Sequence, residues 1–191
     1  MTSETALHIV VPTLWLAWML YWGISARNVK ETRWREPLGS QLLHRVPLIL
    51  VAILLAAPAW LPRPLTKRFL PDGPLFLTLG TVMLAVGLGF SVWARRHLGR
   101  NWSTQVVVKK DHALIRSGPY RHVRHPIYTG ILLALLGSVV TIGEWRGLLA
   151  FLFALVSFAV KSQAEEHQMA GIFPEYQAYR RETAALIPFV Y

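Results

Sequence analysis

Cysteine is absent from this chain of 191 residues, and acidic residues are scarce, with ten against twenty lysines and arginines. The absence of cysteine excludes disulfide bonds, thiolate metal ligands and a cysteine nucleophile. Charged residues make up 16% of the sequence, whereas soluble domains usually contain about 25%. Together with a hydrophobic content of 53%, this shortage of charge argues against a soluble domain.

The motifs of several common enzyme classes are also missing. The sequence has no Gly-x-Ser-x-Gly nucleophile elbow and no Walker phosphate-binding loop. Its histidines lack the His-x-x-x-His spacing that places two metal ligands on one helix face, and its acids show no matching pattern. We therefore expect no metal site.

The hydrophobic residues are concentrated in runs that carry almost no charge. They predict an all-α integral membrane protein with about five spans, at residues 6–26, 46–61, 75–94, 127–143 and 148–160. The first run is long and is interpreted as a retained span. The last two runs are short for about 30 Å of hydrocarbon, and a tight turn joins them. An antiparallel helical hairpin is expected there, with a buried re-entrant pair as the alternative. The length predicts one domain, residues 1–191.

Proline and glycine mark the predicted boundaries. Pro47 suits the first turn of the second span, and the prolines of residues 62–74 predict a non-helical connection. Pro174 suits the start of a C-terminal helix, which would place Tyr176, Tyr179 and Arg180 on one face.

Small residues in the third run predict close helix packing; they are Gly80, Gly87 and Gly89.

The positive charges are distributed unevenly between the two predicted sides. The loops after the first and third spans and the tail hold 16 lysines and arginines, whereas the other side holds four. The positive-inside rule predicts that the C-terminus and the polar segment at residues 112–130 lie in the cytoplasm, with the N-terminus outside. Because basic loops also lie beside anionic membrane lipids, the net charge of +10 does not indicate nucleic-acid binding.

A dense polar and aromatic segment, residues 112–130, adjoins the fourth span. Pro126 at the first helical position would leave His125 near the N-cap, where exposed N–H groups favour an anion and disfavour a protonated histidine. A headgroup anchor is the simpler interpretation of this site. The predicted hairpin, however, brings Glu165 and Glu166 back beside His125, which favours a functional cluster.

Four groups of residues occur in order in the C-terminal half. They are Gly-Pro-Tyr at 118–120, Arg-His-Pro-Ile-Tyr-Thr-Gly at 124–130, Glu-Glu at 165–166 and Phe-Pro-Glu-Tyr at 173–176, followed by Tyr179. Over residues 98–188 this set resembles the isoprenylcysteine carboxyl methyltransferase family, to which phospholipid methyltransferases are related. The resemblance implies an all-α membrane fold that binds S-adenosylmethionine in a cytosolic pocket. The loop after the third span, the hairpin and a C-terminal helix would form that pocket.

The resemblance also implies which residues bind the cofactor. They are Gln105, His112, Ala113, Leu114, Ile115, Tyr120, His125, Pro126, Ile127, Tyr128 and Glu165. Glu165 would balance a positive charge of the cofactor, and the helix end at His125 would take its carboxylate. Whether Glu165 or Glu166 is the acidic contact stays open at this point.

Three residues are candidates for acting on the substrate: Lys161, Glu166 and Arg180. Where the family has an arginine that positions the substrate carboxylate, this chain has Lys161, which keeps the charge but not the planar fork. Arg180 is a second candidate for an anionic substrate group. Glu166 or His167 would serve as a base if the acceptor were an amine or a phenol.

The function that the resemblance implies is methyl transfer to a lipophilic acceptor entering from the bilayer. An isoprenylcysteine-like or other lipid carboxylate is the first choice of acceptor. The alternatives are a phospholipid or small-amine N-methyltransferase, an NADPH-dependent enzyme similar to sterol reductases, and a non-catalytic membrane protein with the same fold.

Overall fold

A computed structural model describes residues 9–27, 38–56, 60–99 and 114–188. Within these ranges the chain is helical and forms no sheet. The helices are α2 (Val11–Ser25), α3 (Leu38–Ala56), α4 (Arg63–Thr66), α5 (Pro74–Leu98), the 3-10 helix η4 (Gly118–Arg121), α6 (Pro126–Ile142), α7 (Trp145–Ile172) and α8 (Tyr176–Glu182).

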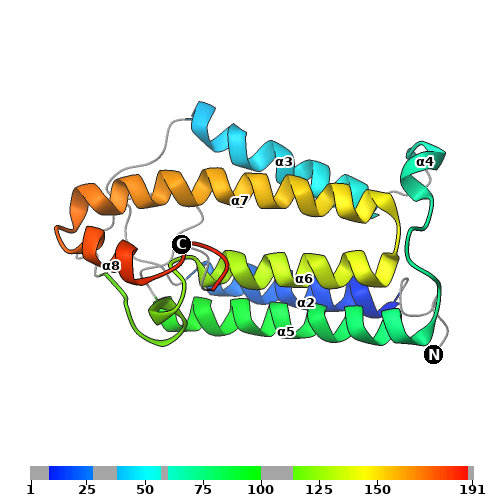
Figure 1. The fold of residues 1–191 in the computed structure, drawn as a ribbon, viewed down its shortest axis with the longest axis horizontal. Coiled ribbons are helices and arrows are strands. Elements are labelled where there is room, and N and C mark those ends of the chain that lie inside the picture. The colour runs from blue at the N-terminus through cyan, green and yellow to red at the C-terminus, as the bar shows by residue number, and fades with distance from the viewer. Residues whose placement is uncertain (1–8, 28–37, 57–59, 100–113, 189–191) are drawn as a thin grey trace.

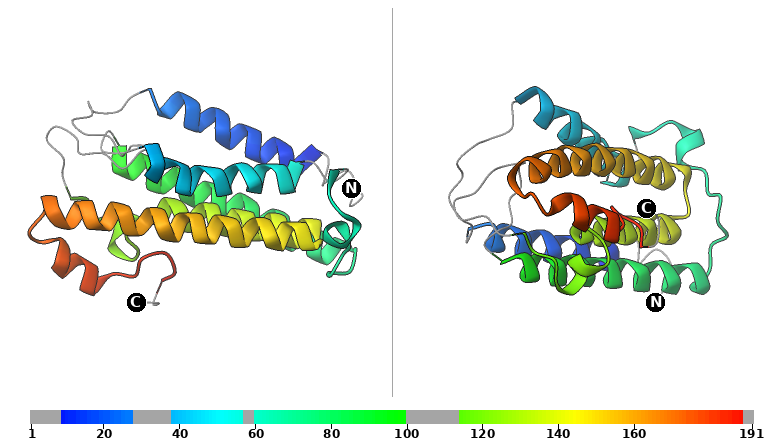
Figure 2. Two further views of the ribbon diagram at one scale, coloured as in Figure 1. Left: turned by 90° about the horizontal axis from the view of Figure 1, so that it is seen from above. Right: turned by 60° about the vertical axis from the view of Figure 1, so that its left-hand side comes forward.

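The five long helices lie side by side and run in alternating directions (Figures 1 and 2). The closest packing joins α5 to α6; α3 packs against α7, and α2 lies against α5. Only Gly143 and Glu144 separate α6 from α7, which pack together as the predicted antiparallel hairpin. Gly143 ends α6 with a φ of 66°, a left-handed conformation that glycine adopts without steric cost.

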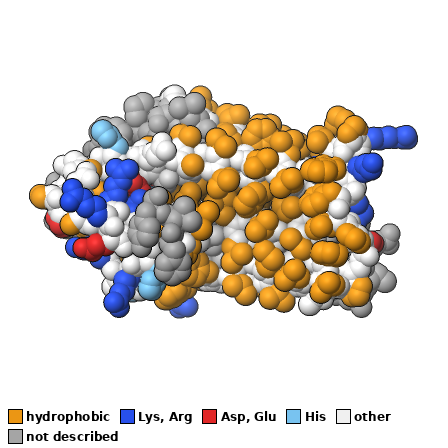
Figure 3. All heavy atoms as spheres, in the orientation of Figure 1, with side chains coloured by type: hydrophobic (Ala, Val, Ile, Leu, Met, Phe, Trp, Pro, Cys, Tyr) orange, Lys and Arg blue, Asp and Glu red, His pale blue; other side chains and the backbone are white. Residues whose placement is uncertain are grey.

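Two helices, α5 and α7, are long and apolar enough to cross a membrane, whereas α6 and the segment Arg45–Ala56 are apolar but shorter. On the face shown in Figure 3, hydrophobic side chains cover the middle of the molecule, and charged side chains gather toward its ends. Leu79, Val82 and Val86 of α5 are about half exposed, which suits contact with lipid rather than water. The count of five spans stays a prediction.

Glycines bring α5 and α6 into close contact. A Cβ atom on Gly80 would lie 2.6 Å from the carbonyl oxygen of Gly137, and one on Gly87 would lie 2.6 Å from that of Gly130. The predicted close packing is therefore confirmed for these two positions. It is wrong for Gly89, where an added Cβ would meet no described atom within 4 Å, because this residue faces away from α6.

The last apolar run belongs to a much longer helix than predicted. α7 has 28 residues and is about 42 Å long, and it continues from the apolar run through Lys161 to Ile172. Residues 161–170 contain neither glycine nor proline and are mostly good helix formers, so nothing in this segment stops the helix. The prediction of two short passes was therefore wrong for the second one. The extension carries Glu165 and Glu166 on a rigid element.

Three proline-based boundaries also differ from the prediction. Pro47 lies inside α3, because the polar residues before it continue the helix back to Leu38. The connection at residues 62–74 contains one helical turn, α4, with Pro64 near its start. The C-terminal helix begins at Tyr176, two residues after Pro174.

Candidate functional site

The segments that the sequence singled out meet at one end of the bundle. η4, the first turn of α6, the last turns of α7 and α8 lie together there (Figure 1). Lysine, arginine, acidic and histidine side chains gather at this end, beside the hydrophobic middle of the molecule (Figure 3). We call it the polar end.

His125 lies between two carboxylates. It is the N-cap residue of α6, directly before Pro126, as predicted. Its Nδ1 lies 3.4 Å from Oε2 of Glu165, and its Nε2 lies 3.2 Å from Oε1 of Glu166. The hairpin of α6 and α7 therefore joins the Arg-His-Pro and Glu-Glu groups in one buried cluster.

The two carboxylates favour the protonated form of His125. Burial by itself lowers the pKa of this histidine, but hydrogen bonds to Glu165 and Glu166, together with their negative charges, raise it above its usual value. A protonated ring donates from both nitrogens, which matches a carboxylate at each. The predicted disfavouring of protonated His125 was therefore wrong, because two nearby carboxylates outweigh the partial charge of a helix end.

An aromatic stack leads from His125 toward the core. The ring of Tyr128 lies 5.5 Å from that of His125 with an interplanar angle of 6°, and 4.8 Å from that of Phe158 with an angle of 12°. The hydroxyl of Tyr128 donates to Oε1 of Glu165 over 2.6 Å. Nζ of Lys161 lies 5.6 Å from the centre of the Tyr128 ring. Glu165 and Lys161 thus border the aromatic stack on the side of α7 that faces α6.

Glu166 is held by three cationic groups. Nε of Arg124 lies 2.8 Å from Oε1 of Glu166, the oxygen that His125 also contacts. Nε of Arg180 lies 3.3 Å from Oε2 of Glu166. The side chain of Glu166 is 9% exposed, so the pairs lie largely out of water. Because both oxygens are engaged, this geometry argues against Glu166 as a general base.

The segment after α8, residues 183–186, runs along the start of α6 and is here called the C-terminal strap. The N–H groups of Arg124 and His125 donate to the carbonyl oxygens of Ala184 and Ala185, over 2.9 and 3.1 Å. The guanidinium group of Arg124 also donates to the carbonyl oxygen of Thr183. Strap carbonyls therefore accept hydrogen bonds from the two backbone N–H groups directly before α6.

Further contacts tie α8 to η4. The hydroxyl of Tyr179 donates to the carbonyl oxygen of Tyr120 over 2.6 Å. Nη2 of Arg116 lies 2.8 Å from Oε2 of Glu182, and its guanidinium carbon lies 5.4 Å from the centre of the Tyr179 ring. Tyr176 and Tyr179 share the buried face of α8. Arg180, predicted to share that face, is mostly exposed and reaches Glu166 through its Nε.

The structure brings most of the sequence-predicted residues to the polar end. Tyr120, Ile127 and Ala94 form a buried cluster, against which Ile115 and Tyr128 pack. Pro126 is buried, and Leu114 is partly buried. Gln105, His112 and Ala113 lie outside the described residues.

Sequence reasoning missed the role of Arg124 and the strap. Sequence analysis placed Arg124 only within the motif at residues 124–130, although its side chain joins α7, α8 and the strap. The sequence signal for Arg124 was the Glu-Glu pair at residues 165–166, since an arginine buried beside a membrane span needs a counter-charge. The strap had no signal, because its contacts are made by backbone carbonyls.

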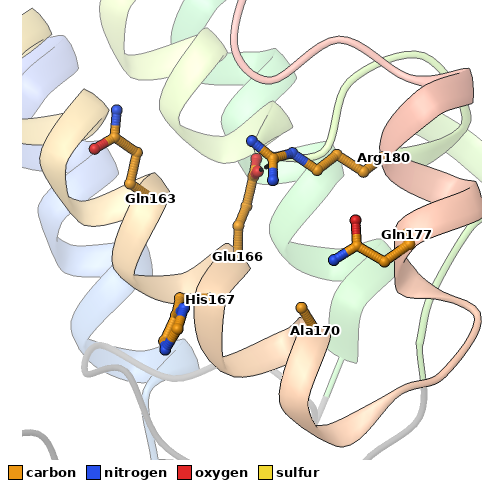
Figure 4. A pocket seen from close by; sticks show the side chains of 6 residues that line it. All are labelled: Gln163, Glu166, His167, Ala170, Gln177 and Arg180. Carbon is orange, nitrogen blue, oxygen red and sulfur yellow. Dashed lines mark ion pairs between the residues drawn. The ribbon is translucent and has the colours of Figure 1, made fainter.

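A pocket of about 220 Å³ opens between α7 and α8 (Figure 4). Its lining residues are Gln163, Glu166, His167, Ala170, Gln177 and Arg180. Figure 4 shows Glu166 and Arg180 reaching toward each other from the two helices. Glu166 is therefore shared between this pocket and the His125 cluster.

Comparison with known proteins gives a match to a family model and matches to curated relatives. Residues 78–171 match the isoprenylcysteine carboxyl methyltransferase (ICMT) family. The chain is 37% identical over 118 residues to the cobalt-zinc-cadmium resistance protein CzcN of Cupriavidus metallidurans, covering 60% of this chain and 50% of that protein. It is 32% identical over 96 residues to protein-S-isoprenylcysteine O-methyltransferase of Schizosaccharomyces pombe, covering 48% and 41%. The chain spans about half the length of the curated relatives that it matches.

The fold is similar to that of a solved structure. The eukaryotic intramembrane Ras methyltransferase ICMT superposes with a TM-score of 0.50 at 19% identity, over 80% of this chain and 50% of that one. The all-helical bundle with its apolar helices is thus the fold of an integral membrane protein. The matched residues 78–171 contain most of α5, all of η4 and α6, and most of α7, and with them His125, Glu165 and Glu166. Through this region the chain resembles the isoprenylcysteine carboxyl methyltransferase family.

Proposed function

We propose that the polar end is the active site of a membrane methyltransferase, which transfers the methyl group of S-adenosylmethionine to a lipophilic carboxylate. The observation that carries the proposal is the cluster of His125, Glu165 and Glu166 inside the region matched by the family. A headgroup anchor needs no buried partners, whereas this cluster is built from two helices and is closed by aromatic rings.

The side chains present fit the proposed cofactor. S-adenosylmethionine, when bound, supplies a methyl group on a positively charged sulfur. A carboxylate and the face of an aromatic ring both attract a cation, and Glu165 and Tyr128 provide them side by side. Glu165 is the better acidic contact of the two candidates, because its side chain is 21% exposed and Glu166 is held by three cations.

The remaining cofactor residues carry over as proposals from the family resemblance. Tyr120 and Ile127 would support the position of the aromatic stack, since Tyr128 packs against the cluster to which they belong. The same proposal includes Gln105, His112, Ala113, Leu114, Ile115, His125 and Pro126.

The acceptor is proposed to be a carboxylate of an amphipathic molecule, of the isoprenylcysteine kind named for the Schizosaccharomyces pombe relative. A carboxylate oxygen attacks the methyl carbon without losing a proton, so no general base is required. The engagement of both Glu166 oxygens supports such an acceptor over an amine, which would need a base. The protein would act mainly by holding the two reactants in line.

The proposed orientation places this end in the cytoplasm and the N-terminus outside, following the distribution of lysine and arginine. The apolar part of the acceptor would lie between spans, with its charged head at the polar end. Membrane lipids would contact the hydrophobic middle of the molecule.

The class of cofactor is tested by titrating S-adenosylmethionine and NADPH separately into the purified protein in detergent. Saturable heat with S-adenosylmethionine alone supports the proposal. Binding of NADPH alone would assign the chain to a reductase-like activity, and binding of neither would favour a non-catalytic protein. Incubation with labelled S-adenosylmethionine and extracted membrane lipids then identifies the acceptor from the labelled product.

A further inference from the structure

His97, in the last turn of α5, contacts the start of η4 at three points. Its Nε2 lies 2.9 Å from Oγ of Ser117. A Cβ atom on Gly118 would lie 2.7 to 2.9 Å from three atoms of the imidazole ring, so the ring occupies the space of a side chain at this position. The ring also stacks on that of Tyr120, with centres 6.3 Å apart and an interplanar angle of 23°. One side chain of α5 therefore holds three residues of the segment 117–120.

The residues of this segment suit the contact with His97. Gly118 has a φ of 59°, a left-handed conformation that glycine adopts without steric cost, and its lack of a side chain leaves room for the imidazole. A serine hydroxyl and an imidazole nitrogen can each donate or accept, so Ser117 can bond to either neutral form of the ring. The hydrogen bond joins residues 20 positions apart in the chain and fixes the start of η4 against α5.

The end of α5 that carries His97 is itself held in place. Arg95, two residues earlier, donates from Nη1 to the carbonyl oxygen of Gly99 and from Nη2 to that of Ser25, each over 2.7 Å. Gly99 is the C-cap of α5, and Ser25 is the last residue of α2. The last turn of α5 is therefore bound both to its own end and to a neighbouring helix, so His97 projects from a fixed support.

Tyr120 connects His97 to the polar end. Its hydroxyl donates to the carbonyl oxygen of Ala94, three residues before His97 on α5, over 3.5 Å. Its own carbonyl oxygen accepts from the hydroxyl of Tyr179 on α8 over 2.6 Å. The Tyr120 ring is buried, and Tyr128 packs against the cluster to which this ring belongs. A shift of Tyr120 would therefore disturb the support of Tyr128 and the attachment of α8 together.

We propose that His97 is a positioning residue for methyl transfer. It holds Tyr120 in place, Tyr120 supports Tyr128, and Tyr128 donates to Glu165. The inference rests on the proposed methyltransferase function, in which Tyr128 and Glu165 attract the cationic sulfur of S-adenosylmethionine. His97 is not among the residues proposed to bind the cofactor and acts on them through Tyr120. Such indirect support matters because small displacements of binding groups cost much of their interaction with a ligand.

The test compares two ligands that differ in the charge on sulfur. The sulfur is cationic in S-adenosylmethionine and neutral in S-adenosylhomocysteine, the same molecule without the methyl group. Each is titrated into the full chain in detergent. His97→Ala should weaken binding of S-adenosylmethionine about tenfold and that of S-adenosylhomocysteine by no more than about threefold, because the groups that attract the cation lose their support. A purely structural role would weaken both ligands alike.

Two further variants separate the contacts of His97. His97→Gln places an amide nitrogen where Nε2 meets Ser117, and it should restore the affinity for S-adenosylmethionine to within about threefold of wild type. Ser117→Ala removes only the hydrogen bond and should lose less affinity than His97→Ala. The double variant His97→Ala/Ser117→Ala should bind no more weakly than His97→Ala alone, because the two residues share one interaction.

His122→Ala is the matched control. His122 is an exposed histidine at the other end of η4, and its side chain forms no hydrogen bond or ion pair with the described residues. It should leave both affinities unchanged. Thermal unfolding confirms that each variant is folded at the temperature of the titration. Equal weakening of the two ligands by His97→Ala would overturn the inference, as would unchanged affinity for both. A loss in His97→Gln as large as that in His97→Ala would also overturn it.

The wild type separates this inference from the proposed function. If the wild type binds S-adenosylmethionine and His97→Ala binds it equally well, the positioning role of His97 fails and the proposed function stands. If the folded wild type does not bind S-adenosylmethionine, the proposed function fails and the inference is overturned with it.

Discussion

The guanidinium group of Arg124 and the carboxylate of Glu166 lie 2.8 Å apart, with side chains 8% and 9% exposed. This ion pair joins the start of α6 to α7, and the same arginine donates to the carbonyl oxygens of Arg180 and Thr183. One side chain therefore holds α6, α7, α8 and the C-terminal strap in register. Glu166, fixed in this way, contributes one of the two carboxylates that confine His125.

Arg124→Ala should strongly destabilise the protein, because it leaves a buried carboxylate with less compensation. Breaking a buried pair by removing one partner typically costs about 3–5 kcal/mol. The free energy of unfolding in detergent, measured by denaturant titration, checks the value. In the double variant Arg124→Ala/Glu166→Gln, the loss in free energy of unfolding should be smaller than the sum of the losses in the two single variants. Additive losses would contradict the coupling.

Gly87→Ala should destabilise the contact between α5 and α6. The new methyl group would lie 2.6 Å from the carbonyl oxygen of Gly130, and a backbone atom cannot rotate out of its way. Gly89→Ala is the matched control on the same helix, because its methyl group would meet no described atom within 4 Å. The control should be neutral or stabilising by about 0.5–1 kcal/mol, the usual preference of a helix for alanine over glycine. Thermal unfolding of both variants decides between packing and helix propensity, and equal effects would contradict the packing argument.

Stability should fall as the pH rises past the point where His125 loses its proton. The pKa of His125 is raised in the folded protein, because the favourable contacts with Glu165 and Glu166 outweigh burial. A raised pKa stabilises the folded state fully below the unfolded value of about 6.5, and the stabilisation disappears as pH rises through the folded value. The free energy of unfolding of wild type and His125→Gln should therefore differ in slope above about pH 6.5. Parallel slopes would show that His125 carries no shifted proton.

Much of the site follows from local sequence signals. Pro126 fixes the start of α6, and the short turn at Gly143 and Glu144 returns α7 to the same end, so that Glu165 and Glu166 meet His125. The length of α7 could not be predicted from hydrophobicity, because helix formers such as Ala164 and Glu165 continue a helix beyond its apolar part. The charge of His125 depends on two contacts across helices, and the strap depends on backbone carbonyls. The sequence predicts the contacts of His125 but not how they balance against burial, and the backbone contacts of the strap leave no pattern in the sequence.

The most direct test of the central claim is titration of S-adenosylmethionine into wild type, Glu165→Gln and Glu175→Gln, with folding checked by thermal unfolding. Glu165 contacts both His125 and Tyr128, whereas Glu175 is an exposed acid ten residues further along the chain. Wild type and Glu175→Gln should bind equally. Glu165→Gln should bind at least about tenfold more weakly, because it removes the charge that faces the cofactor's cation. Unchanged affinity in folded Glu165→Gln would contradict the assignment of the cofactor to this site.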